Sequence, residues 1–196
     1  MGLSTRRRSK VKKKSGFFSR RVIAFMAVIA VVIIVVAYQM ASETDAPTRI
    51  LLVTSMGNIT IELYDDMPIT SGNFRNLVQN GVLDGTIFHR VVHDFVVQGG
   101  DASGKGINVP TIQDELPNKH NNVRGSVAMA KTSEPNSATS QFYINLIDNP
   151  HLDTNYSVFG RVIEGMAVVD AIGDVPTDTA ERPLQDVTLI RAEFTN

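Results

Sequence analysis

From Arg49 onward, hydrophobic and polar positions alternate in short runs, a pattern typical of β-strands. The first two runs flank Met56, Gly57 and Asn58, which predicts a tight hairpin at these residues. Six further strand-like segments follow along the chain: IFHRVV, FVVQGG, GSVAMAK, SQFYINLI, YSVFGRVI and VTLIRAE. This succession of short strands indicates a mainly β domain.

Two segments show the spacing of helices. The first, PITSGNFRNLVQNG, has Pro68 near its start, apolar residues around Phe74 on one face and Gly81 as a stop signal. The second, GMAVVDAI, precedes the last strand. Many short strands with only two helices predict a closed antiparallel barrel capped by those helices. The long polar stretch at 102–123 indicates a functional surface rather than a simple connection.

A different pattern precedes the strands. The run from Val22 to Tyr38 is apolar throughout, contains no Gly or Pro, and approaches the ~20 residues that span a bilayer as a helix. The segment before it, Met1 to Arg21, contains nine Lys or Arg and no acidic residue, which predicts a cytoplasmic N-terminus. The alternative is a cleaved signal peptide, but the run exceeds the roughly 7–15 apolar residues of such peptides.

These features divide the chain into four parts. We predict a basic cytoplasmic segment at 1–21, a single transmembrane anchor at 22–41, a polar linker at 42–48 and a folded domain at 49–196. The domain is expected outside the cytoplasm, in the periplasm of a bacterium or at the cell exterior.

Charge and composition exclude several classes of function. The ten Lys and Arg residues that follow the basic segment share the rest of the chain with all 20 acidic residues. This acidic balance argues against nucleic acid as a partner of the domain. The chain has no cysteine, which excludes disulfides, thiol catalysis and cysteine-ligated metals.

Three apparent motifs are weak. GGDASGKG resembles a phosphate-binding loop, but Gly106 stands where a Ser or Thr would hold Mg²⁺. His89 and His93 have a helical metal spacing, yet they lie in strand-like sequence. Ser140 lacks the G-x-S-x-G elbow of a hydrolase nucleophile. We therefore expect no metal or other cofactor.

The stretch FHRVVHDFVVQGGD carries the most informative departure from its pattern. Arg90 stands among β-branched and aromatic residues, and Gln98 follows near the end of the stretch. Removing a guanidinium from water is costly unless it is paired or has a task. The arginine is therefore a candidate functional residue.

This stretch, GSVAMAKTSEPNSATSQFYIN and HLDTNYSVFGRVIEGMAVVDAI resemble the signature blocks of cyclophilin-type peptidyl-prolyl cis-trans isomerases. The resemblance runs from about Arg49 to Glu193 and implies an eight-stranded antiparallel barrel closed by two helices. It also implies catalysis of X-Pro isomerisation, whose barrier is ~18–20 kcal/mol because of amide resonance. This reaction requires no nucleophile, metal or cofactor.

The resemblance implies a role for particular residues. Arg90 matches the catalytic arginine, and Gln98 matches a glutamine that orients the arginine or contacts the substrate backbone. The matching positions of the proline pocket and the adjoining peptide groove are Phe95, Val96, Ala130, Lys131, Thr132, Gln141, Tyr143, Leu152 and Tyr156. His151 stands where many members carry a tryptophan that contacts cyclosporin, so weak cyclosporin binding is expected.

The sequence thus predicts a membrane-anchored prolyl isomerase that acts on folding or exported proteins. The alternative is a proline-peptide binding module or holdase chaperone on the same scaffold. The presence of Arg90 favours the enzyme, because a binding module needs only the pocket.

Overall fold

The computed structural model describes residues 48–195 together with Ile29 and Val31. The predicted basic segment and nearly all of the predicted anchor and linker lie outside the described residues, so these assignments stay predictions. Among the residues that are described, no helix is both long enough and apolar enough to cross a membrane. The elements below belong to one compact unit, Pro47–Asn196.

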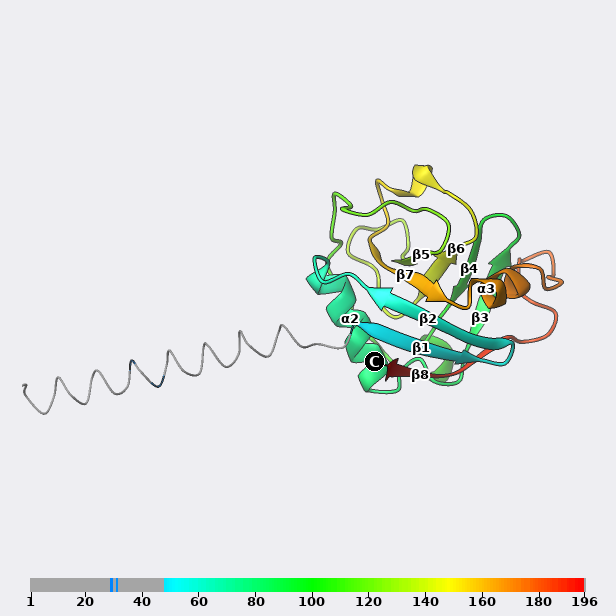
Figure 1. Ribbon diagram of the computed structural model, residues 1–196, viewed down its shortest axis with the longest axis horizontal. Helices are drawn as coiled ribbons and strands as arrows, with labels where there is room; N and C mark the ends of the chain where they lie inside the picture. Colours follow the sequence, from blue (N-terminus) through cyan, green and yellow to red (C-terminus); the bar gives the residue numbers. More distant parts are fainter. Residues whose placement is uncertain (1–28, 30, 32–47, 196) are drawn as a thin grey trace, which may run out of the picture. The chain divides into compact units, whose positions relative to one another are not determined.

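Eight antiparallel strands close into a barrel, as predicted (Figure 1). Around the barrel their order is β1-β2-β7-β5-β6-β4-β3-β8. Their bounds are β1 Arg49–Thr54, β2 Gly57–Leu63, β3 Thr86–Val92, β4 Val96–Gly99, β5 Ser126–Met129, β6 Phe142–Asn145, β7 Val158–Glu164 and β8 Thr188–Thr195. Each predicted strand segment overlaps one of these strands, although β3 begins one residue earlier and β7 and β8 end one and two residues later than predicted.

The hairpin between β1 and β2 differs by one residue from its prediction. Thr54 pairs with Gly57, so the turn consists of Ser55 and Met56 and Gly57 already belongs to β2. Gly57 has φ of 135°, and a Cβ on it would lie 2.9 Å from Cγ2 of Val168. Glycine is therefore needed at this position because the side chain of Val168 comes too close for a Cβ. The turn pattern in the sequence does not reveal this long-range contact.

Two helices pack against the barrel, α2 (Pro68–Gln79) and α3 (Met166–Gly173), and they lie on different sides of it (Figure 1). The first begins at Pro68 as predicted, because the first helical position needs no N–H. Its N-terminus is capped from the long polar loop. The carboxylate of Glu115 accepts hydrogen bonds from the N–H groups of Ile69 and Thr70, at 3.1 and 2.6 Å.

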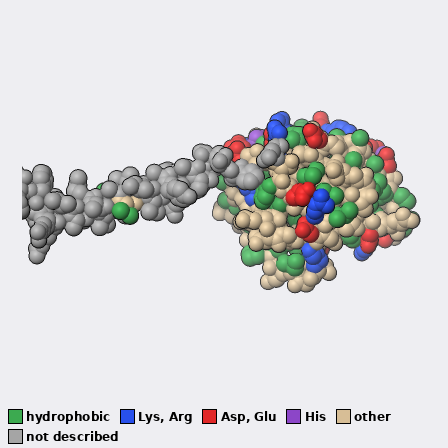
Figure 2. All heavy atoms as spheres, turned by 60° about the horizontal axis from the view of Figure 1, so that its bottom comes forward, with side chains coloured by type: hydrophobic (Ala, Val, Ile, Leu, Met, Phe, Trp, Pro, Cys, Tyr) green, Lys and Arg blue, Asp and Glu red, His purple; other side chains and the backbone are tan. Residues whose placement is uncertain are grey.

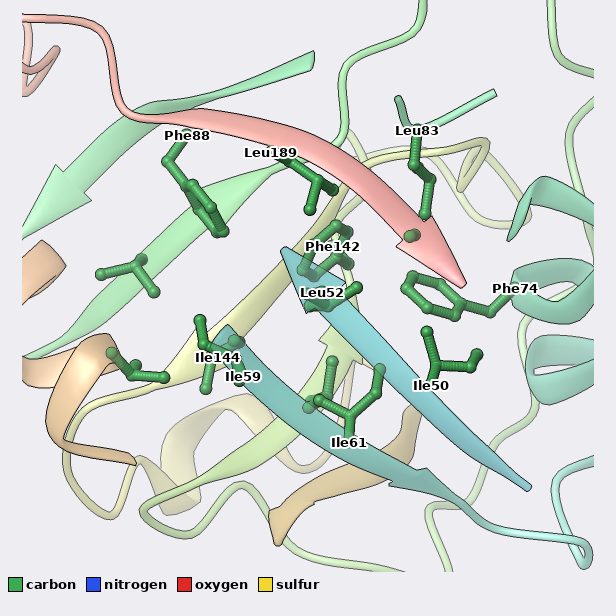
Figure 3. Packing of buried hydrophobic residues seen from close by; sticks show 14 of the residues in the cluster. Ile50, Leu52, Ile59, Ile61, Phe74, Leu83, Phe88, Phe142, Ile144 and Leu189 are labelled. Atoms are coloured by element: carbon green, nitrogen blue, oxygen red, sulfur yellow. The ribbon is translucent and has the colours of Figure 1, made fainter. Parts of the chain in front are cut away.

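Side chains fill the interior of the barrel (Figure 3). Phe74 of α2 packs edge to face against Phe142 of β6, with ring centroids 5.3 Å apart. The labelled residues around them come from several strands and one loop: Ile50, Leu52, Ile59, Ile61, Leu83, Phe88, Ile144 and Leu189. Because the interior is packed, the barrel leaves no internal space for a ligand, and a binding site has to lie on its outer surface.

The surface carries charges of both signs. On the face drawn in Figure 2, acidic and basic side chains are interspersed with apolar and neutral ones. Several of the charged groups are paired across strands, as Glu62 of β2 is with Arg161 of β7 at 2.7 Å. Charged groups of both signs therefore share this face.

Candidate active site

Strands β3 and β4 place Arg90 and Gln98 directly opposite each other. The two residues are cross-strand partners, and the register of the pair shifts between Phe88 and Arg90. Phe88 and Val91 are buried in the core, whereas the Arg90 side chain is 36% exposed. A bulge redirects side chains, and at this one the strand turns a guanidinium to the outside of the barrel.

Arg90 lies at one side of a surface pocket of about 330 Å³. The residues lining this pocket all belong to the set predicted from the sequence: Arg90, Phe95, Val96, Gln98, Ala130, Lys131, Tyr143, Leu152 and Tyr156. They come from β3, β4, β6, the turn between β3 and β4, the residues after β5 and the segment before β7. The fold thus gathers them from positions up to 66 residues apart in the sequence.

The apolar side chains of the pocket belong to a second hydrophobic cluster, which Tyr64 joins to the barrel core. Its buried members are Val96, Ala128, Ala130, Tyr143 and Val158. Partly buried aromatic and aliphatic side chains complete it toward the surface, namely Tyr64, Phe95, Leu152 and Tyr156. The pocket residues are therefore more than an extension of the core, and they offer an apolar surface to a ligand from outside.

Glu181 binds the guanidinium of Arg90. Its Oε2 accepts a hydrogen bond from Nε of Arg90 at 2.6 Å. The guanidinium also lies over the ring of Phe95, with Cζ 5.9 Å from the ring centroid. Sequence reasoning missed Glu181, which is one of several polar residues in the loop before β8 and carries no motif.

The side chain of Gln98 contacts another glutamine. Its Nε2 donates to Oε1 of Gln141 at 2.9 Å. Gln141 is also a predicted site residue, and it lies beside the pocket without lining it. Gln141 in turn interacts with His89 and Asp101. Burial lowers the pKa of His89. Burial by itself would raise the pKa of Asp101, but hydrogen bonds from Ser103 and the nearby His89 lower it on balance.

The floor of the pocket is supported by a buried polar network. The Tyr143 hydroxyl donates to Oδ1 of Asn122 at 2.7 Å, and Nδ2 of Asn145 approaches the same oxygen at 3.2 Å. Asn122 is 1% exposed and is itself held by Asp153 through its N–H at 2.6 Å. Burial raises the pKa of Tyr143, so the phenol stays protonated. Its polar end therefore points to Asn122 and leaves the ring for the pocket.

Sequence reasoning missed Asn122 as well. The signal that could have indicated it is the long polar stretch at 102–123, which was predicted to be a functional surface. That signal did not single out one residue, because the stretch contains many side chains of similar polarity.

The same loop contacts Lys131, one of the residues that line the pocket. Its Nζ is 2.8 Å from Oδ2 of Asp114, and these side chains are only 10% and 13% exposed. Asp114 Oδ2 also accepts the N–H of Asn136 at 3.1 Å. Thr132, the next predicted residue, is exposed, bonds to Oγ of Ser137 at 2.9 Å and does not line the pocket.

His151 lies at the rim, in the short 3-10 helix η3 (Pro150–Leu152). Its ring stacks on Phe95, with centroids 5.8 Å apart and an interplanar angle of 15°. It is exposed and does not line the pocket itself. Tyr156 packs edge to face against Tyr143 at 5.9 Å, which joins the rim to the pocket floor.

The weaker motifs lie elsewhere. Nζ of Lys105, in the phosphate-loop-like segment, donates to the carbonyl of Val82 at 3.1 Å. His93 pairs with Asp94 and Asp174 at 3.1 and 3.2 Å. Among the residues that the structure describes, no group of three or more His, Asp or Glu side chains could hold a metal ion. Ser140 is buried, and its Oγ accepts the N–H of Ala102 at 3.1 Å. None of these side chains lines the pocket beside Arg90.

Fold and site together define a closed β-barrel protein with an apolar pocket on its outer surface and a guanidinium beside that pocket. The family described as "Cyclophilin type peptidyl-prolyl cis-trans isomerase/CLD" matches residues 49–194. A peptidyl-prolyl cis-trans isomerase of Acinetobacter baylyi is 45% identical over 163 residues, covering 76% of this chain and 86% of that protein. One of Streptomyces antibioticus is 47% identical over 160 residues, covering 73% and 96%.

Solved structures agree with these sequence relatives. A Cryptosporidium parvum cyclophilin type isomerase, crystallised in the presence of the dipeptide Ala-Pro, matches with a TM-score of 0.70 and 27% identity. The match covers 76% of this chain and 99% of that one. This chain therefore belongs to the family of cyclophilin type peptidyl-prolyl cis-trans isomerases. Its activity is the cis-trans isomerisation of X-Pro peptide bonds.

Proposed function

We propose that Arg90 catalyses this isomerisation by donating a hydrogen bond to the prolyl nitrogen as the peptide bond twists. Rotation breaks amide resonance, and the nitrogen becomes pyramidal and regains its lone pair. A fixed cationic donor then stabilises the twisted transition state more than the planar ground state. The observation that carries this proposal is the position of Arg90 beside an apolar pocket, on a barrel strand that buries Phe88 and Val91 in the core.

The remaining pocket residues serve binding in this mechanism. A proline ring is apolar, and it fits a pocket formed by Phe95, Tyr143 and Leu152. Gln98 and Gln141 form a hydrogen-bonded pair next to Arg90, where they face the backbone around the twisting bond. Ala130 and Lys131 line the side of the pocket beyond β5. In this mechanism the backbone of Lys131 pairs with the substrate residues that precede the proline, whereas the N–H of Ala130 already donates to the carbonyl of Gln141 at 2.9 Å.

Exchange of Arg90 for alanine tests the catalytic assignment. Loss of one preorganised donor of this kind lowers kcat by about 10²–10³-fold, whereas peptide affinity should change little because the apolar pocket is intact. Arg90→Lys should rescue only part of the activity, because an ammonium keeps the charge but lacks the planar fork. Line-shape NMR on an X-Pro peptide measures both turnover and affinity. A folded Arg90→Ala protein with wild-type turnover would contradict the catalytic role of Arg90. The pocket would then be better explained by the alternative function, the binding of proline-containing peptides.

We also propose that the chain is anchored by residues 22–41, with the isomerase domain outside the cytoplasm, where it acts on exported proteins. The support is the apolar run from Val22 to Tyr38 directly after nine Lys or Arg residues. The relatives from Acinetobacter baylyi and Dickeya dadantii are bacterial, which fits a periplasmic location. Protease added to spheroplasts should digest the domain. Protection equal to that of a cytoplasmic marker would contradict the orientation.

A further inference from the structure

The contact between Arg90 and Glu181 joins residues 91 positions apart in the sequence. The carboxylate engages Nε, the inner nitrogen of the guanidinium, at 2.6 Å. Within residues 48–195, neither Nη nitrogen of Arg90 has a hydrogen-bond partner. Glu181 therefore occupies the one donor that lies nearest the side-chain stem and leaves the outer donors available.

The backbone of Glu181 is fixed to the strand that carries Arg90. Its carbonyl accepts the N–H of Val91 at 2.8 Å, so it is tied to the residue directly after the arginine. Its φ is 63°, a left-handed conformation that is uncommon for residues other than glycine. A non-glycine residue keeps such a conformation only where its surroundings enforce it.

The turn that contains Glu181 supplies those surroundings. The N–H of Glu181 donates to the carbonyl of Asp178 at 3.0 Å, and the N–H of Asp178 donates to the carbonyl of Arg182 at 2.9 Å. Oδ1 of Asp178 accepts two more N–H groups, from Ala180 at 2.8 Å and Arg182 at 3.0 Å. The turn is thus held together internally and presents one carboxylate to β3.

We infer that Glu181 is a positioning residue that orients the guanidinium of Arg90 for catalysis, an inference that rests on the proposed role of Arg90. A guanidinium is planar, so fixing the direction of its Nε–H also fixes the plane in which both Nη groups lie. The ring of Phe95 lies under the guanidinium, with its centroid 5.9 Å from Cζ of Arg90. The Nη donors are then already aimed at the pocket before the substrate arrives, which removes an ordering step from the transition state.

The test compares variants of the full-length protein by line-shape NMR on an X-Pro peptide. Glu181→Ala should lower kcat by about 10-fold, as expected for loss of orientation with the donor retained, and should leave peptide affinity within about twofold. Glu181→Gln keeps an oxygen acceptor and should recover part of the loss. The Nε–H resonance of Arg90 should exchange faster with water in Glu181→Ala, because it loses its acceptor. The loss of kcat at unchanged affinity, and its partial recovery in Glu181→Gln, are what a purely structural role would not produce.

Glu193→Ala is the matched control. Glu193 also pairs through its carboxylate with an arginine Nε, that of Arg191 at 3.1 Å, but it lies on β8 and does not line the pocket. The Glu193→Ala variant removes the same charge as Glu181→Ala and should leave kcat unchanged. If Glu181→Ala does not fold, Glu181→Gln decides the question, because it keeps the size of the side chain and loses only the charge.

The Arg90→Ala background separates this inference from the proposed function. If Glu181 acts through Arg90, Glu181→Ala should have no further effect in that background. Wild-type turnover of Arg90→Ala would overturn the proposed function itself. Low turnover of Arg90→Ala with normal turnover of Glu181→Ala would overturn only the positioning role. An equal loss from Glu181→Ala with and without Arg90 would also overturn it.

Discussion

Replacing Asp114 by alanine removes one half of the most buried ion pair beside the pocket. Lys131 Nζ is 2.8 Å from Asp114 Oδ2, and the two side chains are 10% and 13% exposed. The variant leaves a lysine charge with little access to water. It also removes the acceptor of the Asn136 N–H, which lies 3.1 Å from the same oxygen.

The magnitude follows from this burial. Removing one partner of a buried ion pair costs about 3–5 kcal/mol, because the remaining charge is not compensated. The residual exposure lets water reach Lys131 in part, so we expect the lower end, about 3 kcal/mol. For a domain of this size the melting temperature should fall by roughly 6–12 °C. Peptide affinity should fall as well, because Lys131 lines the pocket.

Urea unfolding of Asp114→Ala, Lys131→Met and the double variant measures the effect. Lys131→Met should cost less than Asp114→Ala, because the Asp114 carboxylate keeps the Asn136 N–H as a donor. The double variant should be less destabilised than the sum of the two, with a coupling of at least about 1 kcal/mol. Additive losses, or a loss below about 1 kcal/mol for Asp114→Ala, would show that water screens this pair as it does a surface ion pair.

Three further predictions concern the pocket and α2. Tyr143→Phe should cost about 1 kcal/mol in unfolding free energy, because Asn122 loses one donor. Its turnover should stay near wild type in the NMR assay, and a large loss would place the hydroxyl in catalysis. Glu115→Ala should cost about 1–2 kcal/mol in urea unfolding by uncapping α2, and unchanged stability would refute the cap. His151→Trp should tighten cyclosporin binding in calorimetry by adding apolar area beside Phe95, and equal affinities would contradict its place at the rim.

Local patterns and family motifs in the sequence predict the elements and most of the pocket residues. The alternation of apolar residues located the strands, and Pro68 marked the start of α2, because these signals depend on residues only a few positions apart. Arg90 was identified because a guanidinium in an apolar strand is costly without a task. The pocket residues were identified through their match to motifs of a known family, since single apolar residues such as Leu152 carry no such signal.

The tertiary structure decided which polar groups meet. Glu181 binds Arg90 across 91 positions of sequence, and Glu115 caps α2 from 46 positions away. In the sequence both are acidic residues in polar loops, indistinguishable from residues that face water. Their partners depend on which loops the closure of the barrel brings next to which strands. Hydrophobic periodicity specifies the inward face of each strand but does not specify how the loops fold over the outside, so these contacts could be found only in the folded molecule.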